Sequence, residues 1–344
     1  MTVRVNKSSF NIREKLSELE RPIGLKGSEL MKAETAQEAG SLLGVGRRNL
    51  CINGNFKIWQ RGTSIAGGAS GNNINEYKYV TADRFQTYFC STYARQDSVL
   101  PSGERVYSLR ETFNSIRCFF VQIIEEGGRI FNQGDYITIS FWAKTSGKQT
   151  GVSLGFYWYT GPNWSGYTFS NTRSNVIIEG SEWKYYTVTT QIPANANDRP
   201  HLAIEFDNNG PYGGTYGDGD WSQLSTGEWW EFANIQIEKG KVATEFEHRS
   251  YGEELALCQR YYEENKSNQF TATGYHISFI RAGMQFQVQK RAAPDVIITS
   301  ALNSAGGALS LSVENENTMG FDYTMNSVSE SYGIKFNYTA DAEL

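Results

Sequence analysis

Apolar and polar residues alternate with a period of two through much of the chain after residue 48. Clear examples are the segments 137–143, 202–206 and 230–237. Successive side chains of a β-strand point to opposite faces, so this pattern predicts strands, and the Gly, Asn and Ser residues between the segments predict turns. Residues 49–250 are therefore predicted to form an antiparallel jelly-roll β-sandwich. In its last strand, one face is expected to carry Glu231, Ala233, Ile235 and Ile237.

Helical spacing replaces the alternation at the start of the chain. In residues 1–48, one amphipathic pattern follows Asn11 and stops at Pro22, and another follows Thr35 and stops at Gly44. Two short helices bury too little apolar surface to fold alone. The segment is therefore predicted to attach the chain to another protein or to copies of itself. The alternative is a leader without a structural role.

A further helical pattern separates two β regions. Leu255, Cys258 and Tyr262 recur at helical spacing and predict a linker helix within residues 251–265. Residues 266–344 alternate again and predict a small C-terminal β domain. The residues expected on its buried faces are Met284, Phe286, Val288, Leu309, Leu311, Val313, Ile334, Phe336 and Tyr338. So few large side chains make a thin core, which oligomerisation commonly stabilises.

Composition supports a mainly β protein with two or three domains. The chain has 344 residues, of which 14% are aromatic, with 34 Gly and 7 Pro. The net charge of −5 and the lack of any Lys/Arg run longer than two argue against nucleic acid as the main partner. The sequence has no apolar run of the roughly 18 residues that a membrane helix needs, so membrane insertion is not expected. Its first residues do not resemble a signal peptide, which predicts assembly in a cytoplasm.

Residues with reactive side chains are few and widely spaced. Each of the four cysteines, Cys51, Cys90, Cys118 and Cys258, is predicted to be a small buried apolar residue, because none forms a C-x-x-C pair. The three histidines lack metal-ligand spacing. His248 is predicted to be a packed, hydrogen-bonded ring at a domain junction.

Carboxylates offer a weak case for catalysis. A glycosidase needs two of them about 5–9 Å apart. Candidates that lie near one another in sequence are Glu205, Asp207, Asp218, Asp220, Glu228 and Glu231. Such spacing is common in solvated loops, so a non-catalytic protein is predicted.

Two long phrases and the chain ending resemble a family of phage and prophage tail-fibre and virion structural proteins. The first phrase comprises Asn49–Phe56, Trp59–Gly62 and Thr81–Phe85; the second is Thr244–Tyr262, and the ending is Tyr338–Leu344. In that family the phrases open and close a jelly-roll domain. The resemblance implies a virion surface protein that forms a homotrimer and docks on another virion protein through residues 1–48.

A second resemblance, to the calcium-containing jelly rolls of carbohydrate-binding modules, rests on the order of short strand motifs. These are the opening Asn53–Phe56, the Ser140–Lys144 strand, and Trp183 with Tyr186. Calcium in those modules uses an acidic residue after the opening strand and an Asp pair on the last strand. Lys57 and Ala233–Asn234 stand at these places here. No metal and no cofactor are therefore predicted.

Aromatic residues in two Gly/Ser/Asn-rich segments are the candidate glycan-binding residues. Rings stack on the apolar faces of sugars, and polar side chains bond the hydroxyl groups. The predicted set is Trp164, Tyr167, Tyr212, Tyr216 and Trp221, with Asp218 and Asp220. The alternative is that these rings pack inside the sandwich or between subunits. Trp158, on the same strand face as Phe156, is predicted to lie in the core.

The sequence thus predicts a non-catalytic virion surface protein, assembled in the host cytoplasm, that attaches the particle to host surface polysaccharide. One alternative is an architectural connector or decoration protein without a ligand. Another is a depolymerase, which needs paired acids in a groove.

Overall fold

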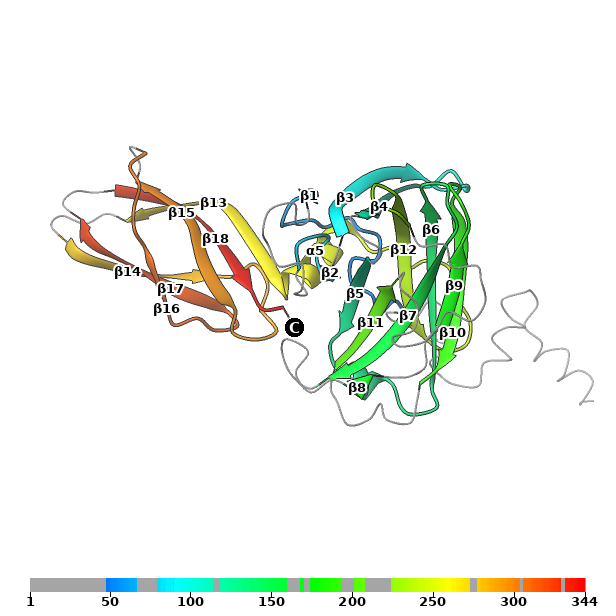
Figure 1. Ribbon diagram of the computed structural model, residues 1–344. Coiled ribbons are helices and arrows are strands. Elements are labelled where there is room, and N and C mark those ends of the chain that lie inside the picture. The colour runs from blue at the N-terminus through cyan, green and yellow to red at the C-terminus, as the bar shows by residue number, and fades with distance from the viewer. Residues whose placement is uncertain are drawn as a thin grey trace, which may run out of the picture. The chain divides into compact units, whose positions relative to one another are not determined.

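A computed structural model describes residues 48–66, 79–88, 90–113, 118–159, 168–169, 174–192, 201–207, 224–272, 277–303, 306–328 and 332–343. The helices predicted within residues 1–48 lie outside these ranges. Residues Asn49–Leu344 form one compact unit. The unit is mainly β, as predicted, and its strands are drawn in Figure 1.

Two antiparallel six-stranded sheets form the sandwich. The first sheet has the order β1 (Ser64–Ala66), β3 (Cys90–Val99), β4 (Arg105–Phe113), β12 (Trp229–Lys239), β6 (Tyr136–Thr145) and β10 (Lys184–Gln191). The second has β2 (Phe85–Tyr88), β5 (Phe119–Ile124), β11 (His201–Asp207), β7 (Thr150–Tyr159) and β8 (Thr168–Phe169), and β9 (Ser174–Ile178) also pairs with β7. A short helix, α4 (Gly127–Ile130), follows β5. This arrangement confirms the predicted β-sandwich class.

The core between the two sheets is rich in aromatic rings. Phe120 stacks on Phe206 with ring centroids 4.6 Å apart and meets Phe232 edge to face at 5.0 Å. The four apolar residues predicted on β6, from Ile137 to Ala143, are fully buried. Trp158 is 1% exposed, which confirms its predicted place in the core. Aromatic rings bury a large apolar area and prefer particular orientations toward one another. These contacts therefore fix how the two sheets pack.

The predicted pattern of β12 is wrong in its second half. Trp230 and Phe232 face the core, and a β-bulge between Ala233 and Gln236 then turns Ile235 and Ile237 to that same side. Asn234, at the bulge, has a positive φ of 48°. The extra residue of a bulge shifts the alternation by one position. Glu231 and Ala233 therefore lie on the opposite face of the strand from Ile235 and Ile237.

Strand β11 is buried on both faces. Leu202, Ile204 and Phe206 lie in the core as predicted, but Glu205 and Asp207 are also fully buried. The strand is central, between β5 and β7, and the Tyr157 hydroxyl donates a 3.0 Å hydrogen bond to Glu205. The regular alternation therefore did not indicate a solvent-facing side.

The linker helix is shorter than predicted. Helix α5 spans Tyr251–Gln259, and the Ser250 side chain caps it by accepting from the backbone N–H of Glu253. Tyr262, predicted to be helical, instead begins β13 (Tyr262–Ala272) and is paired with Asp341. Hydrogen bonding to the C-terminal strand thus ends the helix before residue 262.

Two three-stranded sheets make up the C-terminal β region. One has the order β13, β18 (Tyr332–Asp341) and β15 (Asp295–Asn303); the other has β14 (Ile277–Gln285), β17 (Gly320–Val328) and β16 (Ser312–Glu314). Met284, Phe286, Ile334, Phe336 and Tyr338 are buried in one cluster. Leu309, Leu311 and Val313 are partly buried against this cluster, so most of the predicted apolar face is confirmed, whereas Val288 is half-buried and not part of it. The strands of this region begin at residue 262 and not at 266.

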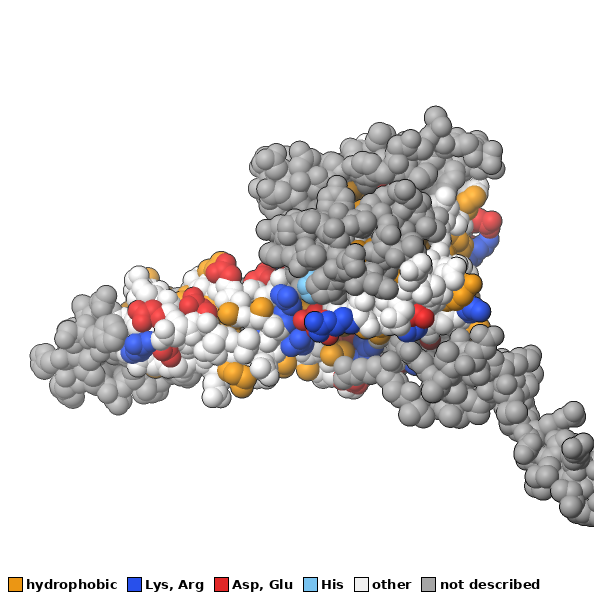
Figure 2. Space-filling model, turned by 90° about the horizontal axis from the view of Figure 1, so that it is seen from below, with side chains coloured by type: hydrophobic (Ala, Val, Ile, Leu, Met, Phe, Trp, Pro, Cys, Tyr) orange, Lys and Arg blue, Asp and Glu red, His pale blue; other side chains and the backbone are white. Residues whose placement is uncertain are grey.

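The cysteines do not share one state. Cys51 and Cys258 are free and buried, as predicted, whereas Cys118 is disulfide-bonded, which corrects the expectation of a simple buried thiol. No helix within the described ranges is long and apolar enough to cross a membrane. On the face drawn in Figure 2, basic side chains lie in small groups with acidic side chains among them.

Candidate functional site

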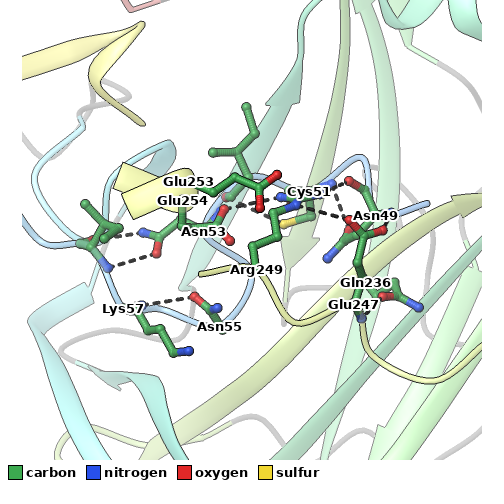
Figure 3. Close-up of polar contacts among 12 residues, drawn as sticks. Asn49, Cys51, Asn53, Asn55, Lys57, Gln236, Glu247, Arg249, Glu253 and Glu254 are labelled. Atoms are coloured by element: carbon green, nitrogen blue, oxygen red, sulfur yellow. Dashed lines mark hydrogen bonds and ion pairs between the residues drawn. The ribbon is translucent and has the colours of Figure 1, made fainter. Parts of the chain in front are cut away.

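The two phrases that carry the tail-fibre resemblance meet in one buried hydrogen-bond network (Figure 3). Arg249, from the second phrase, donates to the backbone carbonyls of Asn49 and Cys51 and lies 3.3 Å from the Glu254 carboxylate. Glu247 accepts from the backbone N–H of Asn49 at 2.9 Å, and Glu254 accepts from that of Asn53 at 2.6 Å. The side chain of Arg249 is 4% exposed. These residues join the opening of the sandwich to helix α5.

Backbone conformation and steric contact explain why Asn53 and Gly54 occupy the opening turn. Asn53 adopts a positive φ of 61°, and its side chain bonds the backbone of Ile58 and Asp83. Gly54 accepts a 2.8 Å backbone hydrogen bond from Ile235, and a Cβ at Gly54 would lie 2.0 Å from the Ile235 carbonyl oxygen. The opening turn therefore packs directly on the β12 bulge, where no side chain fits.

Two arginines of the first phrase bind the end of the C-terminal β region. Arg84 is fully buried, forms an ion pair with Glu343, donates to the Ile123 carbonyl at 2.8 Å and lies 3.5 Å from the Tyr261 ring centroid. Arg61 lies 3.4 Å from the Tyr262 ring centroid. Burial raises the pKa of Glu343, and the charges of the two arginines partly offset that rise. The residues of the two phrases thus make contacts that hold parts of the fold together.

His248 differs from its prediction. Its side chain is 58% exposed and its Nε2 lies 3.7 Å from Glu104, beyond hydrogen-bond distance. The neighbouring Arg249 takes the buried position instead. The side chains on either side of His248, Glu247 and Arg249, are 17% and 4% exposed, so these neighbours are largely buried and His248 lies at the surface.

The strongest candidate for ligand binding is the outer face of the first sheet. We call this surface the aromatic–basic face; it comprises Arg110, Trp142, Lys144, Trp183, Tyr185, Trp229 and Glu231. Trp142 and Lys144 alternate on β6 with residues that face the core, and Tyr185 on β10 is paired with Trp142. Glu231 on β12 is paired with both Arg110 and Lys144. The side chains thus come from four strands and the residue before β10.

Glu231 organises the centre of this face. Its side chain is fully buried, yet one carboxylate oxygen accepts from Ser98 at 2.8 Å and from Ser108 at 2.6 Å. The other oxygen accepts from Arg110 Nε at 2.9 Å and Nη2 at 2.7 Å. A buried carboxylate needs such partners to offset its desolvation. The guanidinium is therefore held in one orientation.

Cations and rings alternate across the face. The Arg110 guanidinium lies 3.9 Å from the Trp229 ring centroid, and Lys144 Nζ lies 4.6 Å from that of Trp183. The rings of Trp142 and Tyr185 are 5.5 Å apart and tilted. Tyr185 is 46% exposed, whereas Trp183 is 9% exposed and forms a small apolar cluster with Leu100, Val106 and Ala233. A face of this kind presents both ring surface and hydrogen-bond donors.

The predicted glycan-binding residues cannot be placed. All seven members of the predicted set lie outside the described residues, namely Trp164, Tyr167, Tyr212, Tyr216, Asp218, Asp220 and Trp221. The strands that precede the two segments are described. Tyr159 ends β7 opposite His201, and Asp207 ends β11 opposite Ser153. Tyr159 and Asp207, the described residues before the two segments, therefore lie at opposite ends of this strand pair.

The described acidic candidates are divided between the two sheets. Glu205 and Asp207 lie on β11 of the second sheet, whereas Glu231 lies on β12 of the first. Glu228 interacts with Lys148 at 3.6 Å. Within the described ranges, no group of three or more His, Cys, Asp or Glu residues is arranged to hold a metal ion. At the place of the expected Asp pair, Ala233 is buried and Asn234 bonds Glu104 at 3.4 Å.

Comparison with known proteins gives structural neighbours only. No protein-family model and no curated protein matches the chain. An enzymatically active domain of tailspike protein 4 from bacteriophage CBA120 is 14% identical over 52% of this chain and 21% of that chain, with a TM-score of 0.31. A CBM4 structure is 16% identical over 54% and 97%, with a TM-score of 0.29. A CBM22-1 xylan-binding domain from Paenibacillus barcinonensis is 10% identical over 58% and 100%, with a TM-score of 0.31.

The neighbours thus include a phage tailspike domain and carbohydrate-binding modules, and the match spans about a fifth of the tailspike domain. At these TM-scores the likenesses carry no argument. The β-sandwich class rests on the strand pairing of this chain, and the candidate site rests on its own geometry.

Part of the aromatic–basic face lies in the strand motifs that resemble carbohydrate-binding modules, but these motifs gave no role to its residues. Trp142 and Lys144 lie in the Ser140–Lys144 motif, and Trp183 opens the motif that ends at Tyr186. The available signal was a Trp at a polar position of an alternating strand. It did not indicate that Arg110, Glu231 and Trp229 lie beside it, because these residues are distant in sequence.

Proposed function

We propose that this protein is a non-catalytic glycan-binding protein of a virion surface, and that the aromatic–basic face binds the glycan. It attaches the particle to polysaccharide on the host. The observation that carries this proposal is the buried Glu231, which fixes Arg110 beside Trp229 on a face that also exposes Tyr185.

The chemistry of the face suits a sugar. Aromatic rings offer apolar surface to the C–H faces of a pyranose, while fixed polar groups bond its hydroxyls. The serine–glutamate–arginine contacts hold the donor in place before the ligand arrives. Preorganisation of this kind reduces the entropy lost on binding.

The virion location is supported by the tail-fibre resemblance of the two phrases. Residues of the two phrases form the buried contacts of Arg249 and Arg84. These contacts connect segments of the fold that are distant in the chain. Mass spectrometry of purified particles and labelling of the chain in electron micrographs test the location. Absence of the chain from particles would contradict it.

Tyr185→Ala tests the binding face. Tyr185 is 46% exposed, so its removal is expected to leave the melting temperature nearly unchanged and to weaken binding to host polysaccharide. The matched control is Tyr251→Ala, at a tyrosine on α5 that is 60% exposed. Equal binding by both variants and the unchanged protein would overturn this assignment of the face.

Incubation of the protein with purified host polysaccharide separates glycan binding from the two alternative functions. An architectural protein binds no purified host polysaccharide, whereas a depolymerase shortens it. Size-exclusion chromatography of the polysaccharide after incubation distinguishes these outcomes from simple binding.

A further inference from the structure

The hydrogen-bond inventory of the aromatic–basic face is strongly unbalanced towards donors. Glu231 is the carboxylate at its centre, and both of its oxygens are occupied by Ser98, Ser108 and Arg110. A carboxylate that is fully buried and bonded in this way has no accessible acceptor for a ligand. Of the seven residues that define the face, only Tyr185, through its hydroxyl, then has a side-chain acceptor available to a ligand hydroxyl.

Its donors, by contrast, remain available. Lys144 Nζ lies 3.9 Å from the nearest Glu231 oxygen, beyond hydrogen-bond distance, and the lysine side chain is 18% exposed. Arg110 uses Nε and Nη2 for Glu231, and Nη1 has no hydrogen-bond partner among the described residues; the arginine side chain is 29% exposed. An ammonium has three N–H donors and a guanidinium has five.

The charges point the same way. Among the described residues, Arg110 and Lys144 both face the Glu231 carboxylate, so these three side chains together carry a net positive charge. Lys144 Nζ is held between two rings, 4.6 Å from the Trp183 centroid and 5.9 Å from that of Trp229. Rings stabilise the ammonium without supplying a hydrogen-bond acceptor. Glu104, at the turn between β3 and β4, is already paired with Asn234 and near His248.

We infer that the glycan bound at this face is anionic, with a carboxylate or an acidic ester on a sugar ring next to Lys144 and Arg110. This inference rests on the proposed function and adds the ligand class. Charge-assisted hydrogen bonds to an acid are shorter and stronger than those to a hydroxyl. One anionic ring at this face does not require the long basic stripe that a nucleic acid needs.

The test uses the full chain on an array of bacterial surface glycans that contains matched neutral and anionic members. The bound glycans are expected to carry uronate or other anionic sugars. Reduction of the carboxyl groups to alcohols in a bound uronate glycan is expected to abolish binding. If removal of ester sulfate or phosphate abolishes it instead, the anion is that ester and the inference still stands.

Substitution of Lys144 tests whether this side chain contacts the anionic group of the glycan. Lys144→Gln is expected to weaken binding of the anionic glycan about tenfold, from the loss of one charge-assisted contact. Lys144→Arg is expected to restore most of it. Lys184→Gln, at a half-exposed lysine paired with Glu179, makes the same change in net charge and is the control.

The outcomes separate the two proposals. Binding of neutral glycans alone, or equal binding after carboxyl reduction and ester removal, overturns the anionic inference and leaves glycan binding intact. Failure to bind any glycan on the array overturns both. Equal loss in Lys144→Gln and Lys184→Gln shows that long-range charge, and not this face, is responsible.

Discussion

Arg84 and Glu343 form a buried ion pair between residues 259 positions apart in the chain. The arginine side chain is fully buried and the glutamate side chain is 5% exposed. Arg61, from the same phrase, lies 3.5 Å from the same carboxylate. Loss of one member of a buried pair leaves an uncompensated charge in a low-dielectric environment.

Glu343→Gln is therefore expected to lower the free energy of unfolding by about 3–5 kcal/mol. Urea unfolding followed by circular dichroism measures this change. The control is Glu179→Gln, which removes an exposed partner of Lys184 and is expected to have little effect on the midpoint. Similar midpoints for all three proteins would show that the Arg84 pair does not stabilise the fold.

Glu111 predicts a dependence of stability on pH. Burial raises the pKa of this carboxyl to about 8, although the indole N–H of Trp230 donates to it at 2.8 Å and acts in the opposite direction. The folded state therefore holds a proton that the unfolded state releases above its ordinary pKa near 4.5. Stability is expected to fall as pH rises from about 4.5 to about 8, by at most about 1.4 kcal/mol per pH unit from this group.

Glu111→Gln isolates this effect, because the amide oxygen still accepts from Trp230 and no longer titrates. The difference in unfolding free energy between variant and unchanged protein is expected to grow in favour of the variant across that pH range. Parallel pH profiles would mean that Glu111 titrates normally in the folded state.

Gly54→Ala tests the contact between the opening turn and the β12 bulge. A Cβ at this position would lie 2.0 Å from the Ile235 carbonyl oxygen, so backbone must move. We expect a loss of about 3 kcal/mol or more, the upper part of the range for overpacked sites. Gly252→Ala, in the first turn of α5, meets no atom within 4 Å and is expected to be neutral or slightly stabilising. Thermal melts of the two variants decide the point, and equal melting temperatures would contradict the predicted clash.

Deletion of residues 1–48 is expected to leave a folded, soluble remainder, because Asn49–Leu344 form a compact unit of their own. If the deleted segment docks on the virion, the truncated chain will not assemble onto particles. Circular dichroism checks the fold, and western blotting of purified particles checks incorporation. Normal incorporation of the truncated chain would refute the docking role.

A homotrimer remains the expected assembly. The edge strand β15 exposes Ile297 by 55% and Leu302 by 40%, so apolar surface is available there for contact with another copy. Native mass spectrometry of the full chain at micromolar concentration measures the assembly. A monomer would contradict the prediction, and a trimer that persists in Ile297→Ser with Leu302→Ser would locate the contact elsewhere.

Local patterns determined the elements of this protein. The alternation of Ile137 with Thr138, or of Phe336 with Asn337, indicated strands and their buried faces, because the two-residue period of a strand is a property of its own backbone. The helical spacing of Leu255 and Cys258 likewise indicated α5. The helix end was missed because pairing of Tyr262 with Asp341, and not local propensity, decides it.

Only the tertiary structure decided the β12 bulge and the candidate site. The bulge at Asn234 packs on Gly54, far away in the chain, and it reverses which residues of β12 face the core. The aromatic–basic face exists because β4, β12, β6 and β10 are neighbours in one sheet, which places Arg110 beside Glu231 and Lys144. Pairing between strands that are distant in sequence depends on packing of the whole core. A local pattern of residues therefore does not predict it.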